Sequence, residues 1–218
     1  MSIKSILFNT EMVKAILIGR KTQTRRLVKN LPLHSPYFEV VDGKPMLCDE
    51  NGDWHPTIAF SRILPGDVLW VRETWRPVRY VRPARAIPVD FKETGFEYKA
   101  DGIVRSDGKP ERWRPSIHMP REAARLFLKV TDVQIERLQD ISPLDINAEG
   151  IKNIEHDEYD VEMSDEAMEQ IMFEELWDST IKPADLPRYG WEANPWVWVI
   201  EFERCEKPEG WNRGSDTT

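Results

Sequence analysis

The stretch of this sequence best equipped for chemistry is the octet GRKTQTRR, residues 19–26, which crowds four cationic side chains and two hydroxyls together. Lys21 and Thr24 are three residues apart, so a helical turn or a tight loop would bring their side chains together. A partly desolvated lysine near other cations has a lowered pKa and can act as a base, with a threonine hydroxyl beside it as nucleophile or proton relay. The other cations of the octet are Arg20, Arg25 and Arg26.

Such a site also needs a carboxylate that orients water or transfers a proton. Glu149 and Glu73 are the candidates, because each is placed at the end of an expected element. Residue types and spacing leave three interpretations of the octet open. It is a solvated basic turn, an anion- or phosphate-binding loop, or the catalytic part of an enzyme.

The segment before the octet predicts a strand followed by a helix. Residues 3–8 form the strand pattern, and Asn9 or Thr10 can cap the helix that follows. Gly19 is suited to end this helix in a left-handed conformation. The octet therefore begins at a helix C-terminus, where the macrodipole favours cations, and this alone could explain Arg20 and Lys21.

A second strand is expected at residues 68–75, where alternation puts Leu69, Val71 and Glu73 on one face. Val68, Trp70 and Arg72 fall on the other face. Both faces become charged at the C-terminal end of the strand. Such a charged end is typical of a pocket mouth or, equally, of a salt bridge at the rim.

The rest of the chain predicts two helices and two strands. Residues 125–133 and 196–202 are expected strands, and Ser142 with Asp145 predicts an imperfect capping box for a helix that Gly150 closes. Ser164 caps a longer helix. Its expected apolar stripe comprises Met168, Ile171, Met172, Leu176 and Trp177.

Two proline-rich stretches interrupt this pattern, at about residues 29–64 and 76–118, and we interpret them as loop-rich insertions. Residues 208–218 are expected to be a disordered tail. The remainder is long enough for one large domain, residues 1–207.

Composition excludes several classes of function. No apolar run approaches the roughly 20 residues that span a bilayer, and no secretory signal is evident, so a cytoplasmic protein without a membrane partner is expected. The two cysteines are isolated and the four histidines are far apart, so neither a disulfide framework nor a metal site is expected. Phosphate-binding, dinucleotide-binding and serine-hydrolase signatures are missing, and no cofactor is expected.

Charge is distributed unevenly along the chain, whose net charge is −8. Residues 1–30 carry seven Lys or Arg and one glutamate, whereas residues 139–178 carry fourteen Asp or Glu and one lysine. This asymmetry indicates a basic face and a separate acidic segment. A polyanionic partner would meet the basic side.

The order of these motifs resembles the ASCH domain, a member of the PUA-like superfamily. The resemblance rests on the octet, on Pro65-Gly66-Asp67 with the strand after it, on residues 140–151, and on the closing strand. The segments ILFNTEMVKAILIGRKTQTRR, GDVLWVRETW and WEANPWVWVIEFE are similar to longer ASCH proteins often seen in phages and prophages.

The resemblance implies an α+β fold, a small PUA-like β-barrel with flanking helices, in which the octet and the Glu149 helix form a cleft. PUA-like folds commonly bind RNA or modified nucleosides. Some small bacterial ASCH proteins remove the acetyl group from N4-acetylcytidine with a lysine, a threonine and a glutamate, which match Lys21, Thr24 and Glu149 here. Another ASCH protein is a ribonuclease, so the family does not determine the reaction.

The leading hypothesis is a protein that binds a nucleoside or a single-stranded nucleic acid, RNA rather than DNA, with hydrolysis of N4-acylated cytidine as its best-specified activity. The alternatives are a non-catalytic RNA- or DNA-binding module, a ribonuclease, and a phage adaptor that binds a protein through residues 155–178. In the cleft, Trp75 would stack on a base, unless it belongs to the barrel core. The expected substrate-binding residues are Arg20, Arg25, Arg26, Arg72, Glu73 and Trp75.

Overall fold

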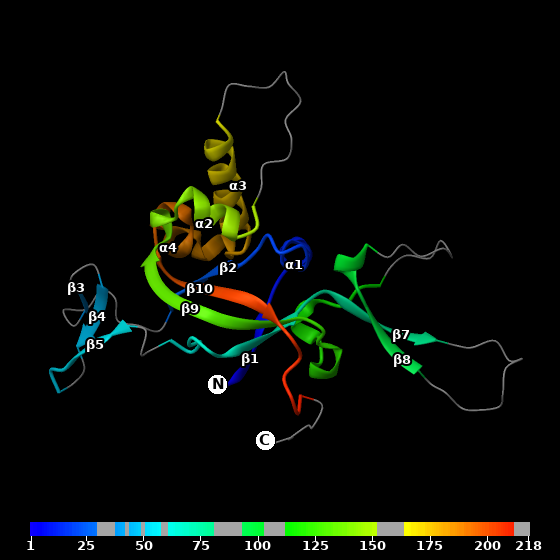
Figure 1. Cartoon of the computed structure of the whole chain (residues 1–218). Coiled ribbons are helices and arrows are strands. Elements are labelled where there is room, and N and C mark those ends of the chain that lie inside the picture. Colours follow the sequence, from blue (N-terminus) through cyan, green and yellow to red (C-terminus); the bar gives the residue numbers. More distant parts are fainter. Residues whose placement is uncertain are drawn as a thin grey trace, which may run out of the picture.

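The fold is built on a five-stranded mixed sheet with the strand order β1-β6-β9-β10-β2 (Figure 1). A computed structural model describes residues 1–29, 38–41, 44–48, 51–57, 61–80, 93–102, 112–151 and 164–211. β1 runs parallel to β6, and the other neighbours in the sheet are antiparallel. The strands are β1 (Ile3–Leu7), β6 (Val68–Arg72), β9 (Phe127–Arg137), β10 (Trp196–Cys205) and β2 (Gln23–Leu27).

Short helices accompany this sheet. The α-helices are α1 (Thr10–Leu17), α2 (Pro143–Ala148), α3 (Asp165–Ser179) and α4 (Leu186–Tyr189). The 3-10 helices are η2 (Lys99–Asp101), η3 (Ser116–His118), η4 (Arg121–Ala123), η5 (Leu138–Asp140), η6 (Pro183–Asp185) and η7 (Trp191–Ala193). Within the described ranges, none of these helices is long and apolar enough to cross a bilayer.

The two faces of β10 pack into different cores. Ile200 lies in a cluster with Val13 and Ile16 of α1, whereas Val199 lies in a cluster with Ile146 of α2 and Phe173 of α3. Alternate side chains of a strand point to opposite faces, so α1 and the α2–α3 pair cover different sides of the sheet. Figure 1 shows α2, α3 and α4 grouped together at one side.

Local signals set the helix ends as predicted. The Asn9 side chain accepts a hydrogen bond from the backbone N–H of Met12, and Gly19 adopts a φ of 77° after the helix. Ser142 and Asp145 form a complete capping box at α2. The stripe predicted for α3 is partly wrong, because Ile171 is 38% exposed while Phe173 is buried.

Two smaller sheets fall in the expected insertions. One has the order β3-β4-β5 and the other is the β7–β8 ribbon, and Figure 1 shows them projecting on opposite sides of the central sheet. Their strands are β3 (Phe38–Val41), β4 (Lys44–Cys48), β5 (Trp54–Pro56), β7 (Trp75–Tyr80) and β8 (Glu93–Tyr98).

The α+β class expected from the sequence is confirmed. In the five-stranded sheet that corresponds to the expected barrel, β1 and β2 are the edge strands. They are joined by a side chain, since the Arg26 guanidinium on β2 donates to the carbonyl of Leu7 on β1 over 2.8 Å.

Trp211 corrects the expectation of a disordered tail from residue 208. This side chain is only 3% exposed and meets the ring of Phe127 edge-on, with 5.0 Å between centroids. It also contacts Trp70 on β6. An indole that buries this much apolar surface anchors the segment after β10 to the sheet. Residues 212–218 lie outside the described ranges.

We predict that Trp211→Ala lowers the free energy of unfolding by about 3–5 kcal/mol, because it leaves a cavity against Phe127 and Trp70. Urea denaturation followed by circular dichroism measures this. Trp54→Ala is the matched control, since Trp54 is 42% exposed, and it should change stability by less than about 1 kcal/mol. Equal stability of the two variants would restore the tail interpretation.

Candidate functional site

Lys21 and Glu149, which are 128 residues apart in sequence, meet in the interior of the protein. The Lys21 ammonium Nζ lies 2.5 Å from Glu149 Oε2 and donates a second hydrogen bond of 2.8 Å to the backbone carbonyl of Glu149. The Lys21 side chain is 0% exposed and that of Glu149 is 5% exposed. The contact is therefore a desolvated lysine–carboxylate pair.

The loop that carries Lys21 is held by three elements. The backbone N–H of Lys21 donates to the carbonyl of Ala15 in α1, and that of Thr22 donates to Ala148 in α2. The N–H of Phe202 in β10 then donates to the carbonyl of Thr22. These bonds determine the position of the Lys21 backbone independently of its side chain.

Gly150 allows α1 and the Lys21 loop to pack closely against the end of α2. Its φ is 92°, and a Cβ at this position would lie 2.9 Å from both Ala15 Cβ and Lys21 Cβ. Residue 150 must therefore be glycine both for its left-handed conformation and for the space that α1 and the Lys21 loop occupy.

Burial is the main influence on the ionisation of Lys21. It lowers the pKa of the ammonium below its ordinary value, while Glu149 acts in the opposite direction. The charges of Arg26 and Arg25 add to the lowering. The Phe8 ring, whose centroid is 5.7 Å from Nζ, covers the ammonium on the apolar side. Lys21 consequently gives up its proton more easily than an exposed lysine does.

Arg25 does not have the expected role of a substrate contact. Its side chain is 1% exposed, and Nη1 lies 3.3 Å from Glu149 Oε1. Nε donates to Glu136 over 2.8 Å, and Nη2 is 3.5 Å from Asp145. Because three carboxylates already surround this guanidinium, its charge is used inside the protein to hold Glu149.

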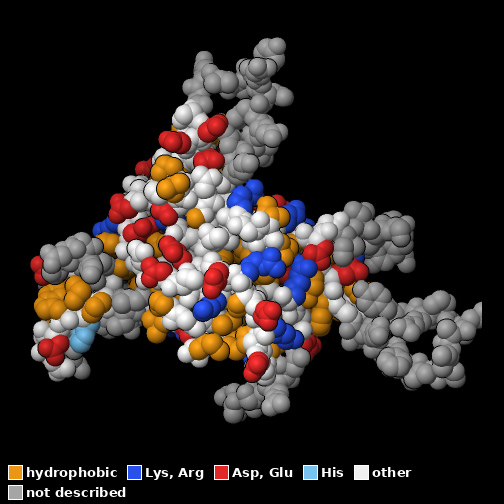
Figure 2. All heavy atoms as spheres, in the orientation of Figure 1, with side chains coloured by type: hydrophobic (Ala, Val, Ile, Leu, Met, Phe, Trp, Pro, Cys, Tyr) orange, Lys and Arg blue, Asp and Glu red, His pale blue; other side chains and the backbone are white. Residues whose placement is uncertain are grey.

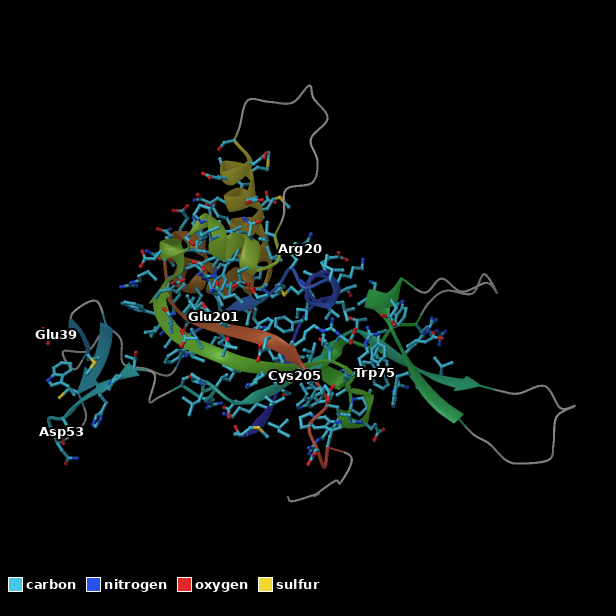
Figure 3. The ribbon with its side chains drawn as sticks, in the orientation of Figure 1. Arg20, Glu39, Asp53, Trp75, Glu201 and Cys205 are labelled. Carbon is cyan, nitrogen blue, oxygen red and sulfur yellow. The ribbon has the colours of Figure 1, made fainter. Side chains whose placement is uncertain are left out.

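Arg26 and Arg20 are placed differently from Arg25. Arg26 is half-buried, with its guanidinium carbon 5.2 Å from the centroid of the Phe8 ring. Its Nε is buried and has no hydrogen-bond partner among the described residues. Arg20 is exposed beyond the end of α1 (Figure 3). Both remain candidates for contact with an anion.

Thr24 is buried in β2, the strand that follows the Lys21 loop. The octet does not form the helical turn that was considered, because residues 23–27 form strand β2. Thr24 pairs with Ile200 in this sheet and is 2% exposed. Among the described residues, no hydrogen bond joins its hydroxyl to Lys21 or Glu149.

The charged end of β6 forms a salt bridge rather than a pocket mouth. Glu73 is 1% exposed and accepts two hydrogen bonds from Arg125, of 2.9 and 3.0 Å. Burial raises the pKa of Glu73, and Arg125 opposes this rise. A carboxylate paired in this way supports the local packing and is not free to bind a base.

Contacts within the protein hold both Trp75 and Arg72. Trp75 is 4% exposed and packs against Tyr98, Met119 and Phe96, which is the arrangement expected of a core residue. It belongs to a cluster at the base of the β7–β8 ribbon, away from Arg20 (Figure 3). The Arg72 guanidinium donates to the carbonyl of Ile117.

Acidic and basic side chains both occur across the face drawn in Figure 2. Asp and Glu gather over α2 and α3, and several Lys and Arg lie around α1 with further acidic side chains near them. Of the acidic segment 155–178 proposed as an adaptor surface, only residues 164–178 are described. Across the described ranges, no three His, Cys, Asp or Glu side chains are grouped to hold a metal ion.

Sequence reasoning missed two participants, Phe8 and Glu136. Phe8 ends the first predicted strand, and nothing in the sequence indicates that an aromatic side chain at this position covers Lys21. Glu136 lies beyond the expected strand 125–133 but within the observed β9, where alternation places it on the same face as Gln134. Only its register with β10, opposite Val197, reveals that it faces Arg25.

No protein-family model matches the sequence, and no curated protein matches it. A similar solved structure is the high-resolution crystal structure of an ASCH domain from Lactobacillus crispatus JV V101. The similarity covers 93% of this chain and 79% of that chain, with 12% sequence identity and a TM-score of 0.34. At this level it is a similarity only and assigns neither family nor activity.

We predict that Gly150→Ala destabilises the protein by about 2–5 kcal/mol, because left-handed strain and overlap with Lys21 act together. Gly66→Ala is the matched control, since Gly66 has a φ of 86° and a Cβ added there would meet no heavy atom within 4 Å. It should lose only about 1–2 kcal/mol from backbone strain. Chemical denaturation measures both losses, and equal losses would contradict the close packing at Gly150.

Proposed function

We propose that this chain is an ASCH-type protein that hydrolyses an amide on a nucleoside, with N4-acylated cytidine as the substrate class. The observation that carries the proposal is the desolvated contact between Lys21 Nζ and Glu149 Oε2, at 2.5 Å. A buried lysine with a lowered pKa, next to a carboxylate, is suited to general acid–base catalysis. The order of motifs that resembles the ASCH domain supports the same substrate class.

In this mechanism the pair starts with one proton held between Lys21 and Glu149. Neutral Lys21 removes a proton from a water molecule as the water oxygen forms a bond to the acyl carbon. Glu149 gives the proton that it shares with Lys21 to the departing amine as the carbon–nitrogen bond breaks. The products are cytidine and a carboxylic acid.

The short contact then restores the starting state, because the proton on Lys21 passes to the Glu149 carboxylate. Arg25 holds Glu149 through Nη1 and keeps its carboxylate directed toward Lys21. Arg26 Nε, for which the described residues provide no hydrogen-bond partner, is a donor for the developing oxyanion. Thr24 is retained as an alternative nucleophile, because it belongs to the motif that matches the enzymes.

A substrate must reach the Lys21–Glu149 pair, which other side chains cover in the structure. The 0% exposure of the Lys21 side chain means that binding has to displace covering groups such as the Phe8 ring. The same burial favours a second candidate, a non-catalytic module that binds a nucleoside or single-stranded RNA and in which Lys21 and Glu149 are structural. Measuring turnover of N4-acetylcytidine distinguishes the hydrolase from the binding module. In either case we propose a cytoplasmic protein.

We predict that the protein releases cytidine from N4-acetylcytidine and that Lys21→Ala lowers kcat by at least about 100-fold, through loss of the base. Chromatographic separation of the two nucleosides measures the rate. Lys14→Ala is the matched control, because Lys14 lies on α1 and pairs with Glu11 at the surface. It should keep normal turnover.

Thermal unfolding of each variant shows whether a loss of rate is a loss of folding. In folded Glu149→Gln, kcat should also fall while KM changes little, because the proton donor is lost. Turnover that survives Lys21→Ala would sink the enzymatic proposal, and no turnover by the unaltered protein would leave the binding module as the better account.

A further inference from the structure

The Lys21–Glu149 pair continues toward the surface through Arg25 and Glu136. Arg25 on β2 contacts Glu149 on one side and Glu136 on β9 on the other. The side chains of Arg25 and Glu149 are almost fully buried, whereas that of Glu136 is 24% exposed. Glu136 is therefore the outer end of a chain of charges that leads from the solvent to the buried pair.

Glu136 is a closer partner of Arg25 than Glu149 is. Its Oε1 atom accepts a hydrogen bond of 2.8 Å from Nε and lies 2.7 Å from Nη2. The hydrogen bond from Nη1 to Glu149 Oε1 is longer, at 3.3 Å. Because the guanidinium is planar, an ion pair on its Nε and Nη2 side also determines where Nη1 points. Here Nη1 points to Glu149.

Gln23 supports the same orientation from another side. It is 5% exposed, and its Oε1 atom accepts a hydrogen bond of 2.6 Å from Arg25 Nη1. Its Nε2 atom donates to Asp145 Oδ1 over 3.2 Å, and Asp145 is held in turn by its capping box with Ser142. Gln23 and Arg25 are two residues apart on β2, so their side chains share a face of the sheet. Arg25 is consequently fixed by groups that do not belong to the pair.

The charge of Glu136 also matters for the pair. The positive charge of Arg25 lowers the pKa of the Lys21 ammonium. A carboxylate in contact with Arg25 offsets part of that charge. Burial raises the pKa of Glu136, Arg25 opposes this rise, and the charges of Asp145 and Asp140 add to it. Replacing Glu136 should therefore change the field that Lys21 experiences.

We propose that Glu136 is a positioning residue for the Lys21–Glu149 pair and acts on it through Arg25. It holds the guanidinium so that Nη1 faces Glu149, and its negative charge limits the effect of Arg25 on Lys21. An ion pair that only tied β9 to β2 would leave the ionisation of Lys21 unchanged. The catalytic consequence rests on the proposed function, whereas the effect on Lys21 does not require turnover.

The test is the titration of the Lys21 side-chain nitrogen by ¹⁵N NMR in the unaltered protein and in Glu136→Gln. The pKa of Lys21 should fall by at least about 0.5 in the variant, because Arg25 is no longer offset and a nearby negative charge is lost. If the pair catalyses hydrolysis, the alkaline limb of the kcat profile should move to lower pH by a similar amount, since the pair then loses its shared proton earlier.

Glu203→Gln is the matched control, because it makes the same change on β10 at a carboxylate that is 60% exposed and lies 3.8 Å from Lys129. It should leave the Lys21 titration unchanged. Thermal unfolding verifies that each variant folds. Glu136→Asp is a second, milder variant, which keeps the charge but shortens the side chain, and it should lower the pKa of Lys21 by less than Glu136→Gln does.

A double-mutant cycle tests the route through Arg25. When Arg25→Gln is already present, adding Glu136→Gln should shift the pKa of Lys21 by less than half of its effect in the unaltered protein. An unchanged or raised pKa in Glu136→Gln, an equal shift in Glu203→Gln, or a full effect without Arg25 would each overturn the inference. A lowered pKa in a protein without turnover would support the inference and count against the proposed hydrolysis alone.

Discussion

The arrangement of this protein depends on one buried electrostatic contact, the pair formed by Lys21 and Glu149. Placing an ammonium group and a carboxylate in the interior carries a large desolvation penalty, which only close contact and further hydrogen bonds offset. The structure provides both, through the 2.5 Å approach, the Glu149 carbonyl and the guanidinium of Arg25. The loop between the consecutive elements α1 and β2 is thereby joined to the end of α2, which is remote in sequence.

The sheet explains how so much charge is accommodated inside. Neighbouring residues of β2 point to opposite faces, so Arg25 enters the side with Glu136 and Glu149, while Arg26 reaches Phe8 and the edge strand β1. One short strand therefore supports the candidate site from one face and ties together the sheet edges from the other. The glycine at position 150 lets α1 and α2 approach closely enough for this arrangement.

Local features of the fold could be predicted from sequence, because their causes are local. The caps at Asn9 and Ser142 and the left-handed Gly19 depend on a few adjacent residues. The strand formed by residues 23–27 could not be identified, since its polar residues show no apolar alternation and their burial depends on distant partners. Trp211 was missed for a similar reason, because its contacts with Phe127 and Trp70 lie far away in sequence.

The candidate site was predictable only in part. Spacing within the octet suggested Lys21 with Thr24, whereas Glu149 is the residue that contacts Lys21. Its position at the end of an expected element made Glu149 one of two candidate carboxylates, and the resemblance to the ASCH motif selected it over Glu73. For Arg25 the sequence suggested a contact that the structure replaces with others. An arginine in a basic stretch suggests a phosphate contact, because the sequence does not show the three carboxylates that surround it in the fold. The ion pairs formed in the folded structure determine which charged side chains can contact a ligand.

The most direct measurement of the central claim is the titration of the Lys21 side-chain nitrogen by ¹⁵N NMR, in the unaltered protein and in Glu149→Gln. The account predicts that the apparent pKa of Lys21 lies below the ordinary lysine value and falls further when the carboxylate is removed, because burial then acts unopposed. An ordinary or raised pKa, or a pKa unaffected by Glu149→Gln, would contradict the desolvated pair.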